Sequence, residues 1–254
     1  MSTSASTAVR RERRGPASWA VIDRPDRANA CGTPVMAALE AWLDDAERDT
    51  AVRVLVLAGA GGIFCPGADL KEAGSLAADR DALVAFLRRG RDLVTRLRSA
   101  RVPVIAAVDG VAFAGGLELM LACDLVMATP RARIGDRHLS QGQVPGWGSS
   151  ALLAAAIGAT SATRLLLGGE IWTAEQAQEI GLVGDVVPID RLDARVAEAV
   201  DVLAAHDADA VDRMLRLTRR RSADLDDALE LEWQVLLEHV DRSRAREHAA
   251  AFRR

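Results

Sequence analysis

Two segments of the chain carry groups suited to stabilising negative charge. Each joins a β-branched apolar run, a glycine-rich turn and a helix-forming stretch: VRVLVLAGAGGIFCPGADL (52–70) and VPVIAAVDGVAFAGGLEL (102–119). A helix that begins after such a turn leaves backbone N–H groups unpaired, and glycine lets a ligand approach them closely. Two such N–H groups directed at one oxygen form an oxyanion hole, which stabilises developing charge by about 3–4 kcal/mol per donor.

Taken singly, each segment is also explained as a tight turn between a strand and a helix. The run Gly-Ala-Gly-Gly at 59–62 lacks the G-x-G-x-x-G spacing of a dinucleotide-binding turn. The sequence also has no phosphate-binding loop that ends in Gly-Lys-Ser or Gly-Lys-Thr. A dinucleotide-binding dehydrogenase, which would share the alternation of strands and helices, is therefore disfavoured.

Glu118 adds a titratable group next to the second turn. It follows Gly115 by three residues and falls just inside a helix expected at 117–122. The positive end of that helix favours a carboxylate there. Such a carboxylate can act as a general base or acid on a water molecule or on a substrate carbon. The alternative is a surface glutamate in a first helical turn.

Strands and helices alternate along most of the chain, which predicts an α/β fold with a mostly parallel sheet. From about residue 192 the pattern is helical, so we divide the chain into an α/β core, 1–195, and a C-terminal helical region, 196–254. Thr33 is expected to cap the first helix. Strands are expected at 9–14, 17–22, 52–58, 102–108, 125–128 and 183–187, helices at 34–48, 79–100, 117–122, 150–157, 161–167 and 174–179, and a mostly irregular segment at 129–150.

Composition narrows the class of protein. The 254 residues carry a net charge of −4, which argues against nucleic acid as the main partner. No membrane span is expected, because charges interrupt the apolar windows, and the N-terminus has no apolar signal segment. The three cysteines match neither a disulfide framework nor a zinc site, so a cytoplasmic protein is expected. The pattern of His206, His239 and His248 predicts no metal site.

Six motifs, in order, resemble those of the crotonase superfamily, the enoyl-CoA hydratase/isomerase family. The resemblance covers roughly residues 9–252, nearly the whole chain. The motifs are IDRPDRANA (22–30), FCPGADL (64–70), DGVAFAGGLELMLACDLVMA (109–128), VPGWG (144–148), LLLGGEIWTAEQAQEIGLVGDVVP (165–188) and DLDDALELEWQVLLEHVDRSRAREHAAAF (224–252).

The resemblance implies a crotonase-like ββα superhelix core and a C-terminal helical region that makes the contacts of a homotrimer or homohexamer. It places the oxyanion hole at the N–H groups of Ala68 and Gly115, and a catalytic glutamate at Glu118. Coenzyme A would enter as part of an acyl-CoA substrate, with no cofactor permanently bound. The coenzyme A groove would comprise Pro66, Ala68, Asp69, Leu70 and Lys71, with Arg24 or Arg27 near the phosphates and Phe252 near the adenine.

The position of the second hydratase glutamate is filled by His138. An imidazole, with an unperturbed pKa of about 6.5, can carry protons near neutral pH; a solvent-facing or packing histidine is the alternative. The resemblance implies reaction through a thioester enolate, with hydration of a 2-enoyl-CoA as the first choice and His138 assisting Glu118. Double-bond isomerisation, decarboxylation or C–C hydrolysis of an acyl-CoA, and a non-catalytic acyl-CoA-binding subunit, are the alternatives.

Four further residues lie inside these motifs. Trp147 stands where the family has a small residue, and it either narrows the acyl pocket or fills core. Cys65 is interpreted as a packing residue, because no histidine lies near it in the sequence. Asp69 is expected to cap the helix after its loop, and Asp124 to fix the geometry of a loop where a strand begins.

Overall fold

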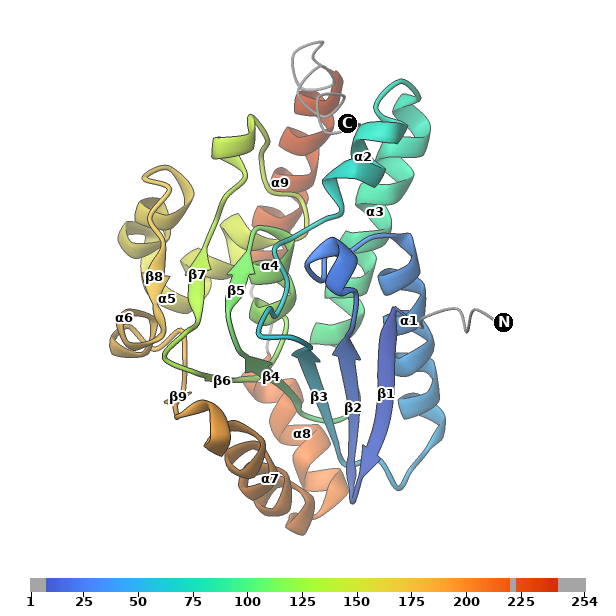
Figure 1. Cartoon of the computed structure of the whole chain (residues 1–254), viewed down its shortest axis with the longest axis vertical. Coiled ribbons are helices and arrows are strands. Elements are labelled where there is room, and N and C mark those ends of the chain that lie inside the picture. Colours follow the sequence, from blue (N-terminus) through green and yellow to red (C-terminus); the bar gives the residue numbers. More distant parts are fainter. Residues whose placement is uncertain (1–7, 220–222, 242–254) are drawn as a thin grey trace.

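The computed structural model describes residues 8–219 and 223–241, and its elements are labelled in Figure 1. The strands are β1 (Val9–Arg14), β2 (Ala17–Ile22), β3 (Val54–Gly59), β4 (Val104–Val108), β5 (Val111–Phe113), β6 (Leu125–Ala128), β7 (Arg133–Gly135), β8 (Trp172–Thr173) and β9 (Asp185–Val186). The helices are α1 (Thr33–Arg48), α2 (Leu70–Leu76), α3 (Arg80–Arg98), α4 (Gly115–Leu121), α5 (Ser149–Leu166), α6 (Ala174–Glu179), α7 (Ile189–Ala205), α8 (Ala208–Thr218) and α9 (Ala223–Asp241), with short 3-10 turns at Pro25–Arg27 and Leu139–Gln141.

The main sheet has six strands in the order β1-β2-β3-β4-β6-β9. The β1 strand is antiparallel to β2, and every other neighbouring pair in the sheet is parallel. A second sheet contains β5, β7 and β8. The predicted α/β fold with a mostly parallel sheet is therefore confirmed.

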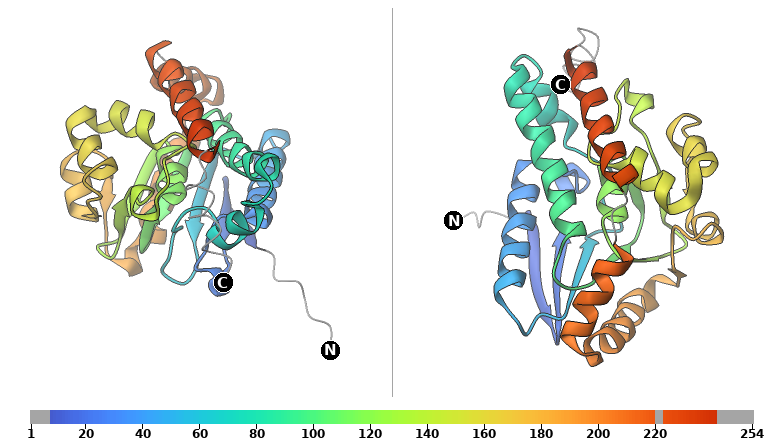
Figure 2. Two further views of the ribbon diagram at one scale, coloured as in Figure 1. Left: turned by 90° about the horizontal axis from the view of Figure 1, so that it is seen from above. Right: turned by 180° about the vertical axis from the view of Figure 1, so that it is seen from behind.

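Both faces of the main sheet are covered, because successive residues of a strand point to opposite sides. On β3, Leu55 and Leu57 belong to a core that includes Leu39 of α1. The intervening Val56 belongs to a second core, with Val196 of α7. On the first side α3 packs against α9, as Figure 2 shows. This burial on both faces explains why β3 and β4 read as continuous apolar runs.

The local elements differ from the sequence prediction in three places. Gly32 is the N-cap of α1, and Thr33 is the first residue of that helix, so the predicted Thr33 cap is wrong. The helices expected at 150–157 and 161–167 are one element, α5, interrupted at Gly158, where φ is +76°. The β5, β7 and β8 strands were not predicted; each is two or three residues long, too short to show a period in the sequence.

The expectation that charges interrupt every long apolar window is wrong for α5. This helix is apolar enough and long enough to pass a test for a membrane span, and Arg164 is the only basic or acidic residue in it. The same test is passed by core helices of soluble proteins. In this structure α5 packs against α4 and α9, and 33% of it is buried.

The proposed boundary between the α/β core and the C-terminal helical region does not coincide with the end of a helix or strand. The division at residue 195 falls inside α7, which packs on β3, β4 and β6. The two-part division of the chain stays a prediction. Phe252 and His248 lie outside the described residues.

Candidate active site

The two glycine-rich loops lie directly against each other. The N–H of Cys65 donates to the carbonyl oxygen of Val111 at 2.9 Å, and the N–H of Phe113 donates to the carbonyl oxygen of Cys65 at 3.1 Å. A Cβ atom on Gly116 would collide with that same carbonyl oxygen. Glycine at 116 therefore permits the close approach of the two backbones.

This approach brings the amides of Ala68 and Gly115 together. Asp69 N donates to the carbonyl oxygen of Cys31 at 3.1 Å, so the N–H of Ala68, the preceding residue, points to the opposite side. Gly115 is the first residue of α4, and a Cβ placed on it would lie 3.1 Å from the nitrogen of Ala68. Hydrogen bonds among the described residues leave both N–H groups without an acceptor.

The residue between the loops and α4 adopts an unusual backbone conformation. Ala114, the N-cap of α4, has φ +47° and ψ −118°. A non-glycine residue held there costs about 1–3 kcal/mol, and such strain collects at functional sites. Its own N–H is satisfied by the carbonyl oxygen of Gly135 at 3.2 Å.

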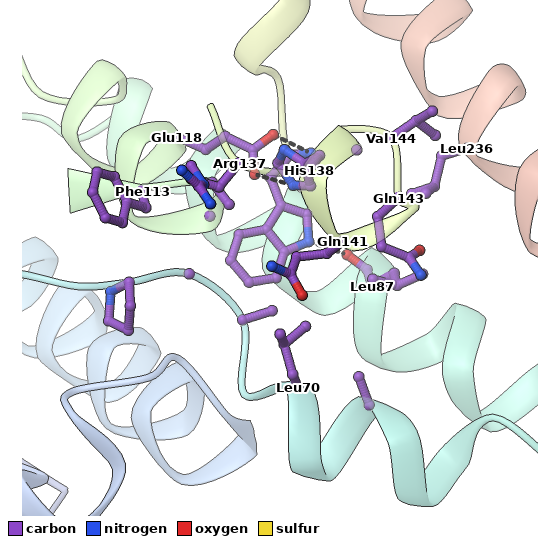
Figure 3. Close-up of a pocket in the computed structure, with 18 of the residues that line it drawn as sticks. Leu70, Leu87, Phe113, Glu118, Arg137, His138, Gln141, Gln143, Val144 and Leu236 are labelled. Atoms are coloured by element: carbon purple, nitrogen blue, oxygen red, sulfur yellow. Dashed lines mark hydrogen bonds and ion pairs between the residues drawn. The ribbon is translucent and has the colours of Figure 1, made fainter. Parts of the chain in front are cut away.

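These amides open onto a cavity of about 420 Å³ (Figure 3). Pro66, Ala68 and Leu70 line the cavity, whereas Asp69 and Lys71 do not. The apolar part of the wall comes from the glycine-rich loops, α2, α3, α9 and the segment before α5, and the polar part comes from α4 and the loop after β7. The apolar residues include Leu83, Leu87, Val144, Leu236 and Val240, and the polar ones are Glu118, Arg137, His138, Gln141 and Gln143.

Glu118 reaches the cavity from α4 but is only 1% exposed. Its Oε1 accepts hydrogen bonds from the backbone N–H groups of Trp147 at 2.8 Å and Ser149 at 3.1 Å. Burial raises the pKa of Glu118 to about 8, against the lowering effect of the His138 charge. Because Oε1 is occupied, Oε2 is the oxygen that remains for chemistry.

His138 lies opposite that oxygen and is held by Asp136. Its Nε2 is 4.0 Å from Oε2 of Glu118, and its Nδ1 is 2.9 Å from Oδ2 of Asp136. Ser149 Oγ donates to the same Asp136 oxygen at 2.7 Å. Burial lowers the pKa of His138, but the hydrogen bond that its ring donates to Asp136 and the charge of Glu118 outweigh this effect, so the pKa of His138 is raised. The carboxylate fixes the proton on Nδ1 and leaves Nε2 directed at Glu118.

A third buried carboxylate, from α9, meets the same helix start. Glu232 is 7% exposed, and its Oε2 accepts from the backbone N–H of Ser150 at 2.8 Å and from the hydroxyl of Ser150. Glu118, Asp136 and Glu232 are therefore all bonded to residues 147–150, where the positive end of α5 favours negative charge. Burial raises the pKa of Glu232.

Trp147 lines the cavity and also belongs to the core, and its predicted narrowing of an acyl pocket stays a prediction. Its indole Nε1 donates to the carbonyl oxygen of Leu87 at 2.9 Å, and the side chain is 4% exposed. A Cβ on Gly115 would lie 2.5 Å from its Cζ3 atom, and one on Gly90 would collide with the ring. The indole is thus packed between two glycines, one of them next to the paired amides.

The residues expected to bind coenzyme A have structural contacts of their own. Asp69 caps α2, as predicted, by accepting from the backbone N–H of Glu72 at 3.2 Å. It also pairs with Arg24 at 3.3 Å, and Arg27 lies 4.0 Å away. Their roles toward coenzyme A, and that of Lys71, stay predictions.

Two further interpretations agree with the structure. Burial raises the pKa of the Cys65 thiol to about 12, which keeps it protonated and inert as a nucleophile. Asp124 accepts from the backbone N–H of Val104 at 2.8 Å, where β4 begins, and pairs with Arg219. Within residues 8–219 and 223–241, no three His, Cys, Asp or Glu side chains are grouped to hold a metal ion.

The sequence interpretation missed three members of this site. Asp136 stands two residues before His138, a spacing that could have suggested its role. Ser149 and Glu232 lie far from Glu118 in the chain, at the N-terminus of α5 and on α9, and nothing in their local sequence indicates a site. The packing of α5 against α4 brings in Ser149, and the packing of α9 on α5 brings in Glu232.

Comparison with known proteins adds independent information. A model of the enoyl-CoA hydratase/isomerase family matches residues 18–253. A probable enoyl-CoA hydratase from Rhizobium meliloti is 35% identical over 82% of each chain. The enoyl-CoA hydratase EchA19 from Mycobacterium tuberculosis is 36% identical over 82% of this chain and 79% of its own. A crystal structure of an enoyl-CoA hydratase/isomerase from Xanthobacter autotrophicus superposes with a TM-score of 0.87 at 30% identity, covering 97% of both chains.

Proposed function

The chain belongs to the enoyl-CoA hydratase/isomerase family and is an enzyme of that family, and from that premise we propose that it adds water to the double bond of a 2-enoyl-CoA thioester. The observation that carries the proposal is the placement of Glu118 and His138 at one cavity beside two amides without acceptors. Water addition needs one group that accepts a proton and one that gives a proton, together with stabilisation of the enolate between the two events.

The N–H groups of Ala68 and Gly115 would hold the thioester oxygen. Support comes from their closeness and from the direction of the Ala68 amide. As water adds to the β-carbon, electrons move to this oxygen, and hydrogen bonds to it become stronger. Because both donors are backbone groups fixed by the two packed loops, no reorganisation is needed when the charge forms.

Glu118 and His138 would share the two proton transfers. Ionised Glu118 takes a proton from water through Oε2 as the oxygen bonds to the β-carbon, and protonated His138 gives its Nε2 proton to the α-carbon. The 4.0 Å between Oε2 and Nε2 is longer than a direct hydrogen bond, a separation at which a water molecule can contact both groups. Asp136 would hold the imidazole in place for this step.

The test is hydration of crotonyl-CoA, followed by loss of the enoyl thioester absorbance and by detection of 3-hydroxybutyryl-CoA. Glu118→Gln keeps an oxygen for the amides of Trp147 and Ser149 but cannot accept the proton, so we expect hydration to fall at least about 100-fold. Glu198→Gln is the matched control, because that side chain is 57% exposed.

Three outcomes overturn the proposal. Full hydration by Glu118→Gln removes the role given to that carboxylate. Absence of water addition by the wild type, combined with hydrogen exchange at the α-carbon, would identify isomerisation or another enolate reaction. Binding of acyl-CoA without any turnover would identify a non-catalytic subunit.

The assembly we propose is a homotrimer or homohexamer in the cytoplasm. In α8 none of the residues is buried, and Met214 and Leu217 are 58% and 68% exposed, which leaves an apolar side for a subunit contact. Analytical ultracentrifugation should give three or six chains, and a monomer would contradict the assembly. The free thiols of Cys31, Cys65 and Cys123 agree with a reducing compartment.

A further inference from the structure

Arg137 is a cation in the active-site cavity that the protein does not neutralise. It precedes His138 in the chain, lines the same cavity and is half-buried (Figure 3). The ion pairs and hydrogen bonds of the described residues leave its guanidinium without an acceptor. By contrast, nearby Arg131 is bound to Asp109, and Arg133 donates to two backbone carbonyl groups.

The acidic groups around the cavity are not available to Arg137. Asp136 is already engaged by the His138 ring and by Ser149, and Glu232 by Ser150. Glu118 accepts at Oε1 from the backbone N–H groups of Trp147 and Ser149, and its Oε2 faces His138. The cavity therefore holds an uncompensated positive charge in a partly desolvated place, where a carboxylate would be bound strongly.

We propose that Arg137 is a binding residue for a carboxylate on the acyl group, so that the preferred substrate is a 2-enoyl-CoA derived from an unsaturated dicarboxylic acid. The proposal rests on the proposed function, since it assigns the substrate class of the same site. A guanidinium offers two parallel N–H donors to a carboxylate, a geometry that gives both affinity and orientation.

The other anionic groups of such a substrate are the phosphates of coenzyme A. They are separated from the sulfur by the whole pantetheine arm, whereas Arg137 is adjacent in the chain to His138, one of the two groups placed at the reacting carbons. A carboxylate a few carbons beyond the double bond can lie near both. The placement of Arg137 thus favours the acyl group as the source of the anion.

The experiment compares acyl groups that differ in one carboxylate. The probes are the five- and six-carbon trans-2-enedioyl-CoA thioesters, each beside the 2-enoyl-CoA of the same chain length. We expect the wild type to prefer the carboxylated substrate in kcat/KM. Arg137→Met should lose about 10- to 100-fold on that substrate and less than about threefold on its neutral partner. Arg137→Lys, which keeps the charge but not the paired donors, should lose less.

Arg133→Met is the matched control, because Arg133 lies on the neighbouring β7 strand but does not line the cavity. A second arm uses the same acyl groups on N-acetylcysteamine, which carries no phosphate. If Arg137→Met still lowers kcat/KM for the carboxylated acyl group on this carrier, the result supports the acyl carboxylate as the group that Arg137 binds. A loss that is equal for neutral and carboxylated acyl groups on coenzyme A, and that disappears on N-acetylcysteamine, assigns Arg137 to a phosphate and overturns the proposal.

A binding measurement separates this proposal from the proposed reaction. Calorimetric titration with glutaryl-CoA and pentanoyl-CoA, which have no double bond, needs no turnover. Tighter binding of glutaryl-CoA by the wild type, lost in Arg137→Met, supports the carboxylate site even if hydration is not observed. Equal affinity for the two thioesters in both proteins overturns it even if hydration proceeds.

Discussion

The carboxylate of Glu118 and the imidazole of His138 face each other across 4.0 Å, and each is fixed on its far side. Two backbone amides hold Glu118 at Oε1, and Asp136 holds His138 at Nδ1. The surroundings raise the pKa of both groups. Burial raises the pKa of Glu118, whereas the neighbouring carboxylates raise the pKa of His138 against the lowering effect of burial. The two therefore titrate as one unit, with pKa values that belong to the pair.

The contribution of Asp136 can be tested by Asp136→Asn, which keeps the shape of the side chain but removes its charge. That charge raises the pKa of both His138 and Glu118, although burial is the larger influence on each. We expect the whole profile of kcat against pH to move to lower pH, and the maximal rate to fall about 10- to 1,000-fold as the imidazole loses its fixed orientation. Asp81→Asn, at a side chain 96% exposed, should leave the profile unchanged. An unchanged pH profile in Asp136→Asn would show that the charge of Asp136 does not set the pKa values of His138 and Glu118.

Burial of Glu118 also predicts how stability depends on pH. The folded protein keeps this group protonated up to about pH 8, whereas the unfolded chain ionises it near 4.5. Between these values the native state binds more protons, so the free energy of unfolding decreases as pH rises, by up to about 1.4 kcal/mol per pH unit. His138, whose folded pKa is also raised, acts in the same direction above its unfolded value.

Glu118→Gln removes this ionisation. The difference in the free energy of unfolding between the variant and the wild type should therefore grow in favour of the variant from pH 5 to pH 8, by roughly 1–4 kcal/mol. Urea unfolding at three pH values measures it. Parallel stability curves for the two proteins would mean that Glu118 ionises in the folded state as readily as in the unfolded chain.

The carboxylate of Glu232 should act on Glu118 from the other side of the α5 start. Its charge raises the pKa of Glu118, after the larger effects of burial and of His138. Glu232→Gln retains an oxygen for Ser150 and should shift the pKa of Glu118 downward, so that activity extends to lower pH. Glu230→Gln, two residues away and paired with Arg91 at the surface, is the control. A loss of activity with no change in the pH profile would indicate a purely structural role.

The sequence predicted the parts of the site that lie on local motifs. The glycine turns, Glu118 and His138 belong to short segments whose spacing is visible along the chain, and the long apolar runs marked the central strands. Contacts between distant segments could not be predicted in this way. Ser149 meets Asp136 and Glu118 only because α5 starts beside α4, and Glu232 meets Ser150 across 82 residues of chain.

The short strands were not predicted for a different reason. The β5 and β7 strands have three residues each, so neither shows an alternating pattern, and their pairing comes from tertiary packing. The Thr33 cap failed because Gly32, in extended conformation, precedes the first turn, and the side chain of Glu72 accepts from the N–H of Thr33.

Trp147 separates the active-site cavity from a second one. The indole lines both the 420 Å³ cavity and a neighbouring cavity of about 390 Å³ that also contains Asp226 and Glu232. Trp147→Ala should join the two, at a stability cost of about 3–5 kcal/mol for the lost buried ring. The backbone N–H that Glu118 accepts from is retained.

The kcat/KM for longer acyl chains should then rise relative to that for crotonyl-CoA, because the indole that blocks the end of the acyl chain is removed. Trp147→Phe keeps a ring between Gly90 and Gly115 and should preserve most of the wild-type chain-length preference. The measurement is a series of 2-enoyl-CoA thioesters from four to ten carbons, run at a temperature where circular dichroism shows both variants folded. Identical chain-length profiles for the alanine and phenylalanine variants would mean that acyl chains extend along the apolar wall of Leu83 and Leu236 instead, and that the indole serves only the packing of the core.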